Sequence, residues 1–255
     1  MFVGRTDAVG TAEPTMLALG DSITFGYDPH ANPHNAASMA GYAHLVADSL
    51  ALRLINAACP GEASGGFLSP TGVDNGCRGY RSSFPLHVSY SGTQFDFARE
   101  ELRMVRSVRL VTIDLGVNDL LREHGVISPD LFADVTANLI EALEGLRATG
   151  YRGAIVVVNA YAWDYAGSAP AQVERLNEAI GDAAHQVGAP VADAYGAFAG
   201  KALDAGGSDC AAGLIIPMAP GRCDIHPTPA GAATLAEAVL TAAAKVGVEP
   251  PPTRN

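Results

Sequence analysis

The stretch M-L-A-L-G-D-S-I-T-F-G at residues 16–26 decides the fold. Its apolar residues run unbroken into Gly20, which is the pattern of a strand buried on both faces of a parallel sheet. Open α/β sheets gather their reacting groups just beyond the carboxyl ends of such strands, so Ser22 is a candidate nucleophile. The same serine suits a turn or a helix N-cap equally well. Thr24 stands where the G-x-S-x-G elbow requires a glycine, which excludes that motif.

Downstream of this stretch, short apolar runs alternate with segments of helical periodicity. Further strands are expected at residues 53–58, 109–115, 154–158 and 189–194, and helices at 38–52, 93–105, 128–150, 169–187, 195–203 and 229–246. This alternation predicts a parallel sheet with helices on both faces. Nothing resembles a linker, so we expect one domain over residues 1–255, with flexible tails at 1–14 and 248–255. Segment 63–92 lacks sustained periodicity and is expected to be a functional loop or partly helical, segment 206–221 is expected to be irregular, and both are expected to shape a substrate pocket.

The composition limits the classes of partner. The chain has 255 residues and a formal net charge of −11, which argues against nucleic acid and anionic membrane surfaces. No apolar run approaches the 18 residues that a membrane span needs, and residues 1–14 lack the basic and apolar regions of a signal peptide. A small neutral substrate is the easiest to reconcile with this charge.

The four cysteines allow two interpretations. The sequence contains no C-x-x-C pair, and its cysteines are too widely spaced for a zinc ribbon, so we expect no metal site at Cys59, Cys77, Cys210 and Cys223. They fall into two couples, 59 with 77 and 210 with 223, each of which brackets a loop that a disulfide would close. Disulfides would indicate a secreted or cell-surface protein, whereas four buried thiols would suit the cytoplasm.

Other chemically capable residues also follow predicted strands. Gly61 follows the second strand, Asn118 follows the third, and Asp224 and His226 precede the last helix. Because right-handed crossovers bring strand-to-helix loops to one edge of a sheet, we expect these residues to meet Ser22. A serine nucleophile needs a base, which His226 supplies, and donors for the oxyanion, which the N–H groups of Ser22 and Gly61 and the Asn118 amide supply.

Four blocks of this sequence, in this order, resemble those of the SGNH (GDSL) hydrolase superfamily. They are G-D-S-I-T-F-G at 20–26, Gly61, G-V-N-D at 116–119 and D-I-H-P-T at 224–228, and the resemblance spans residues 16–240. It implies a flavodoxin-like three-layer α/β/α sandwich with a central five-stranded parallel sheet. It also implies Ser22 as nucleophile, His226 as general base, an oxyanion hole from Ser22, Gly61 and Asn118, and no cofactor.

One departure from the family pattern concerns the acid. The commonest form is D-x-x-H-P, but Cys223 stands three residues before His226 and Asp224 only two before it. Either Asp224 orients the imidazole, or a backbone carbonyl near Cys223 does so and leaves a Ser22/His226 dyad.

The leading functional hypothesis is a cofactor-free serine esterase or lipase. Its substrates would be lipids, short acyl esters, acetylated sugars or thioesters, as the resemblance implies. An O-acyltransferase would use the same residues, and a catalytically silent flavodoxin-like binding module is the alternative from another class. Tyr161 and Trp163, which follow the fourth strand, either line the acyl site or only pack their loop. The sequence leaves the acyl chain length and the oligomeric state open.

Overall fold

A five-stranded sheet forms the centre of the protein. The structure is a computed structural model that describes residues 13–124, 126–167 and 169–251. The strands lie in the order β2-β1-β3-β4-β5, and all neighbours are parallel, which confirms the predicted sheet. Their bounds are β1 Thr15–Gly20, β2 Arg53–Asn56, β3 Val108–Asp114, β4 Ala154–Val158 and β5 Val191–Ala192. Because the strands are parallel, their carboxyl ends share one edge of the sheet.

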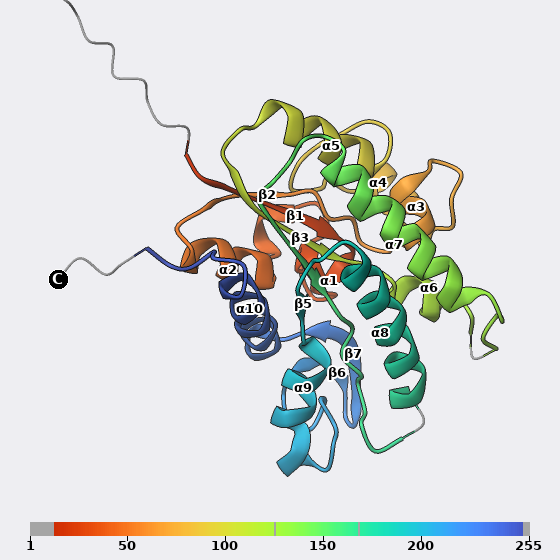
Figure 1. Cartoon of the computed structure of the whole chain (residues 1–255). Coiled ribbons are helices and arrows are strands. Elements are labelled where there is room, and N and C mark those ends of the chain that lie inside the picture. Colours follow the sequence, from red (N-terminus) through yellow and green to blue (C-terminus); the bar gives the residue numbers. More distant parts are fainter. Residues whose placement is uncertain (1–12, 125, 168, 252–255) are drawn as a thin grey trace, which may run out of the picture.

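Helices cover both faces of the sheet and complete the α/β/α sandwich (Figure 1). On one face lie α5, α7 and α8, and on the other lie α2 and α10. The helices and 3-10 turns are α1 Ser22–Phe25, η1 Ala36–Ser38, α2 Tyr42–Ser49, α3 Ser64–Leu68, α4 Cys77–Ser83, α5 Gln94–Met104, α6 Val117–Leu121, α7 Leu131–Arg147, α8 Ala169–Gln186, α9 Ala194–Ala202, η2 Leu203–Ala205 and α10 Pro229–Ala244.

Alternation along β1 shows why the sheet needs both layers. Leu17 and Leu19 pack into the core that contains α5, α7 and α8, whereas Met16 and Ala18 pack into the core that contains α2 and α10. Successive side chains of a strand point to opposite faces, so a continuous apolar run is stable only when both faces are covered.

Segments 63–92 and 206–221 both contain regular structure, and the first is partly helical. Residues 63–92 include α3 and α4, and residues 206–221 include β6, Ile215–Ala219. This strand pairs antiparallel with β7, Arg222–Pro227, in a hairpin separate from the main sheet. The expectation of an irregular 206–221 segment was therefore wrong at its end. The hairpin is mostly half-buried or exposed, and Pro217 lies in the middle of the apolar residues 214–219, where a proline argues against a central strand.

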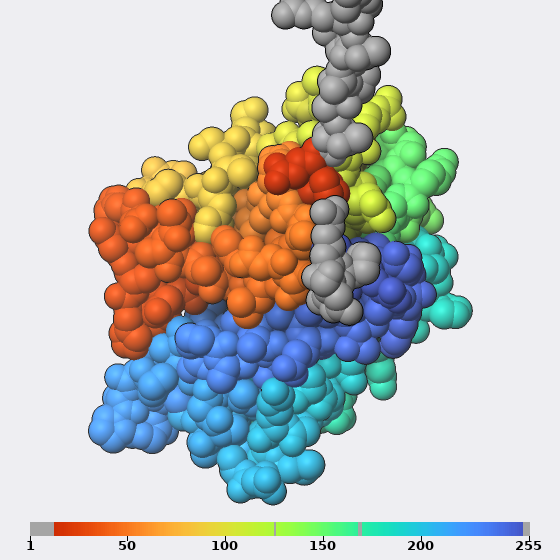
Figure 2. Space-filling view, turned by 90° about the vertical axis from the view of Figure 1, so that its left-hand side faces the viewer, coloured from red at the N-terminus to blue at the C-terminus, as the bar shows by residue number. Residues whose placement is uncertain are grey.

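The hairpin is held against the rest of the molecule near its tip. His30 Nε2 lies 3.2 Å from the carbonyl oxygen of Pro217 on β6. Figure 2 shows that α2 lies beside α10 on the same face of the molecule.

The flexible tails expected at 1–14 and 248–255 fall largely outside the described residues, although Val248 is buried. Within the described part of the chain, no helix combines the length and apolarity needed to cross a membrane.

Candidate active site

Ser22 is the first residue of α1 and follows β1 after one intervening residue, Asp21. The Asp21 backbone is extended, and its Oδ1 accepts a hydrogen bond of 2.9 Å from the Ile23 N–H, which caps the short helix. Ser22 is 8% exposed. Among the described residues its backbone N–H has no hydrogen-bond acceptor. The turn thus presents a serine hydroxyl and a free N–H at the carboxyl edge of the sheet.

Gln94 on α5 fixes the strand end on which this turn rests. Its Oε1 accepts a hydrogen bond of 2.7 Å from the Gly20 N–H, and its Nε2 donates one of 3.0 Å to the Gly20 carbonyl. Gly20 has a φ of +147°, and a Cβ there would lie 2.5 Å from the Asp114 carbonyl oxygen. The glycine of this block is therefore required by the close approach of β1 to β3.

Asp21 also links the serine turn to Asn118. The Asn118 Nδ2 donates a hydrogen bond of 2.8 Å to the Asp21 Oδ2. Burial raises the pKa of the Asp21 carboxyl to about 6, against the lowering influence of the Ile23 N–H, the His226 charge and the Asn118 amide. The Asp21 side chain therefore joins the cap of the short helix to the Asn118 amide.

Asn75 connects the two other predicted oxyanion donors, and the sequence analysis did not identify it. Its Nδ2 donates a hydrogen bond of 2.8 Å to the Asn118 Oδ1, and its backbone N–H donates one of 3.0 Å to the Gly61 carbonyl. Gly61 has a φ of +84°, and a Cβ there would lie 2.7 Å from the Asn75 carbonyl oxygen. Like Ser22, Gly61 has an N–H without an acceptor among the described residues. Asn75 therefore holds Gly61 and Asn118 in one arrangement.

His226 lies on β7 with its Nδ1 against Asp224. The Asp224 Oδ1 forms a short hydrogen bond with the His226 Nδ1 and accepts another, of 3.0 Å, from the His226 backbone N–H. The bond to the imidazole is the main cause that lowers the pKa of Asp224. Of the two acceptors that the sequence left open, the carboxylate is the one in contact with the imidazole.

The other imidazole nitrogen has no partner. The His226 Nε2 is buried and makes no hydrogen bond within the described residues. The imidazole packs against the Tyr27 ring at 4.8 Å between centroids, and the Tyr27 N–H donates to the Ser22 carbonyl. His226 is thus beside the serine turn without being hydrogen-bonded to it, as catalytic pairs often are before substrate binds.

Two disulfides constrain the segments that carry Gly61, Asn75 and His226. Cys59–Cys77 closes the segment that carries Gly61 and Asn75, and Cys210–Cys223 ties β7 to the segment before β6. Glu62 lies beside the first bridge, but both cysteines there are oxidised and offer no thiolate to a metal ion. Disulfides persist in oxidising environments, so the two bridges favour an extracellular location.

Comparisons with known proteins support the same fold. The GDSL-like Lipase/Acylhydrolase family model matches residues 18–234. No curated protein matches the chain. Among solved structures, LAE5, an alpha/beta hydrolase enzyme from the metagenome of Lake Arreo, Spain, is 19% identical with a TM-score of 0.58, over 92% of this chain and 97% of that one.

Two further structures are similar to this one. A catalytic mutant of Axe2, an acetylxylan esterase from Geobacillus stearothermophilus, is 17% identical with a TM-score of 0.59, over 96% of this chain and 99% of that one. TesA is 20% identical with a TM-score of 0.57, over 91% of this chain and 99% of that one. At these identities the likeness establishes the fold. The family match covers most of the chain and includes the serine turn, so the chain belongs to the GDSL-like lipase/acylhydrolase family of hydrolases.

Proposed function

We propose that the protein is a serine esterase that hydrolyses carboxylic esters through an acyl-enzyme on Ser22. The observation that carries the proposal is the pairing of Asp224 with the His226 Nδ1, which leaves Nε2 unpartnered beside the serine turn. This arrangement suits a general base, because the carboxylate holds the proton on Nδ1 and leaves Nε2 basic.

In the first half of the reaction the Ser22 Oγ attacks the ester carbonyl carbon, and its proton passes to the His226 Nε2. The carbonyl oxygen becomes an oxyanion. As the tetrahedral intermediate collapses, the bond from carbon to the alcohol oxygen breaks, and His226 donates its proton to the departing alcohol. In the second half a water molecule gives a proton to His226 and attacks the acyl carbon. The bond to Ser22 then breaks, and the serine regains its proton.

Three donors support the oxyanion in this proposal. The N–H groups of Ser22 and Gly61 lack acceptors among the described residues, and one amide hydrogen of Asn118 is committed to Asp21 while the other is available. Preorganised donors of this kind act where charge develops, and one of them is typically worth ~10² to 10³ in rate.

A covalent inhibitor tests this function directly. We expect the protein to hydrolyse p-nitrophenyl acetate and a serine-directed fluorophosphonate to stop that hydrolysis. Peptide mapping by mass spectrometry should place one phosphonyl group on Ser22. Absence of hydrolysis, or a label on another residue, would contradict the proposal.

Replacement of Asn75 tests how the oxyanion donors are held. We expect Asn75→Asp to lower kcat by about tenfold with little change in KM, because the carboxylate cannot donate to the Asn118 Oδ1 and the amide loses its orientation. The measurement is steady-state hydrolysis of p-nitrophenyl acetate, with the thermal midpoint recorded for both proteins. A variant with the wild-type kcat would show that Asn75 does not position the amide.

A further inference from the structure

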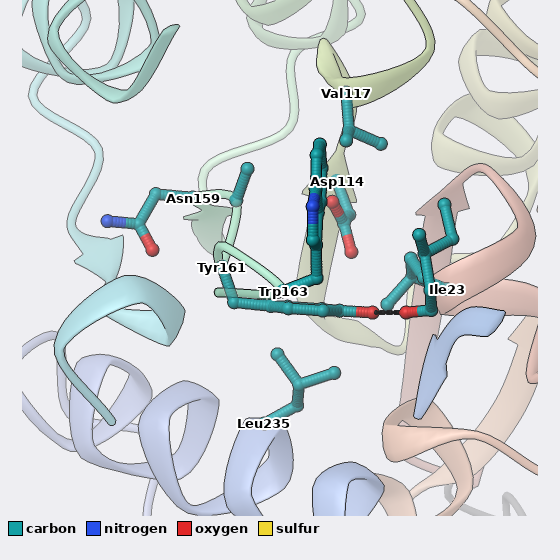
Figure 3. A pocket seen from close by; sticks show the side chains of 9 residues that line it. Ile23, Asp114, Val117, Asn159, Tyr161, Trp163 and Leu235 are labelled. Atoms are coloured by element: carbon teal, nitrogen blue, oxygen red, sulfur yellow. Dashed lines mark hydrogen bonds between the residues drawn. The ribbon is translucent and has the colours of Figure 1, made fainter. Parts of the chain in front are cut away.

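A small cavity lies among the segments that follow β1, β3 and β4, and Figure 3 shows the side chains that line it. Its lining includes Ile23, Val117 and Ile225, which are the chain neighbours of Ser22, Asn118 and His226. The three segments that supply the proposed nucleophile, oxyanion donor and base thus each place one apolar side chain on the same cavity wall. The cavity therefore adjoins the segments that carry the proposed catalytic residues, although those residues do not themselves line it.

The remaining walls come mainly from the segment after β4. Figure 3 shows the Trp163 indole extending from the level of the Tyr161 ring toward Val117, alongside the Asp114 carboxyl. Tyr161 is a fixed wall, because its ring stacks on Phe198 at 4.1 Å and its hydroxyl donates to the Ile225 carbonyl. Trp163 is only partly buried and lies outside any helix or strand, so its side chain can be shortened without interrupting a regular element.

The volume of this cavity is about 20 Å³. A space of that size holds roughly one water molecule or a group of similar size, such as the methyl of an acetyl group. Asp114 is the acidic group on the wall. Burial and then the neighbouring Asp21 charge raise its pKa well above the ordinary range. A raised pKa favours the neutral form of this carboxyl, which suits a cavity for an apolar group.

A second cavity, of about 550 Å³, is lined by residues of α2 and α10, and Ile23 lines both cavities. Its lining includes Tyr27, the residue on which the His226 ring rests. The leaving alcohol receives its proton from His226 in the proposed reaction, so the alcohol side of the ester faces Tyr27 and the larger cavity. The acyl side then faces the smaller one.

We propose that the small cavity is the acyl site, that it restricts the enzyme to acetyl and similarly short acyl groups, and that Trp163 sets this limit. The proposal rests on the proposed esterase function and narrows its substrates to esters of short, unbranched acids. Longer acyl chains would contact the Trp163 indole. The opposite walls are fixed, because they belong to the edge of the sheet and to Tyr161, whose ring stacks on Phe198.

The test compares p-nitrophenyl acetate, butyrate and hexanoate, which share one leaving group. For the wild type we expect kcat/KM to fall by about tenfold or more from acetate to butyrate, as one excess methylene in a filled pocket costs at least that much. Trp163→Ala should abolish or reverse this preference. Val117→Ala enlarges the facing wall and should shift the preference the same way, which keeps the test decisive if the tryptophan variant folds poorly.

Leu45→Ala is the matched control, because Leu45 lines only the larger of the two cavities. It should leave the acetate to butyrate ratio at the wild-type value. A wild type that prefers hexanoate, or ratios that follow Leu45 rather than Trp163 and Val117, would overturn this inference while Ser22-dependent hydrolysis still upheld the esterase function. Absence of hydrolysis of every ester would overturn both.

Discussion

Ser22→Ala is expected to lower kcat for p-nitrophenyl acetate by about 10⁴-fold or more, because the proposed mechanism forms the acyl-enzyme on the Ser22 hydroxyl. The cavity and the oxyanion donors remain in this variant, so KM should change little. The thermal midpoint should also stay close to that of the wild type, since the Ser22 hydroxyl makes no hydrogen bond among the described side chains and the Asp21 cap is unaffected. Burst kinetics and steady-state hydrolysis measure the loss.

The matched control for this change is Ser49→Ala. The Ser49 hydroxyl is exposed on α2 and bonds only to the Leu45 carbonyl of its own helix. This variant should retain the wild-type rate within about twofold, as exposed substitutions away from the site usually do. A Ser22→Ala protein that keeps more than about a tenth of the wild-type rate would rule out Ser22 as the nucleophile.

Asp224→Asn is expected to reduce kcat by roughly 10² to 10⁴-fold. The carboxylate only accepts hydrogen bonds, so it keeps the proton on the His226 Nδ1 and leaves Nε2 free for the serine proton. An asparagine presents an amide donor to the same nitrogen and favours the tautomer with the proton on Nε2, which cannot act as the base. The effect should fall on kcat rather than on KM.

Asp204→Asn provides the control for the change of charge. Asp204 is an exposed acid in η2, away from β7, and its replacement should leave the rate unchanged. A rate for Asp224→Asn near that of the wild type would mean that the aspartate does not set the tautomer. A backbone carbonyl near Cys223 would then remain as the acceptor, with Ser22 and His226 acting as a dyad.

Local pattern was sufficient for the sheet and for the residues that end its strands. β1 and β4 contain unbroken apolar runs that end at Gly20 and before Asn159, and that pattern depends only on neighbours in the chain. Gly20 also has its explanation in the structure, because β3 passes too close to it for a side chain. The hairpin of β6 and β7 was missed, since its strands are partly exposed and their pairing depends on contact with the 27–38 loop and on the Cys210–Cys223 bridge.

The sequence by itself predicted the layered fold and the family, and both predictions are confirmed. It also led us to propose Ser22, Gly61, Asn118 and His226 as the site, because each of these stands at a position defined by a strand end or by a short block. Only the tertiary structure decided what holds and surrounds that set. Asn75 and Gln94 act through contacts made across 43 and 74 residues of chain, and such contacts leave no local pattern. The space beside Trp163 is likewise a product of packing between distant segments, so the chain-length limit that we infer from it becomes visible only when the sheet, its helices and the hairpin are assembled.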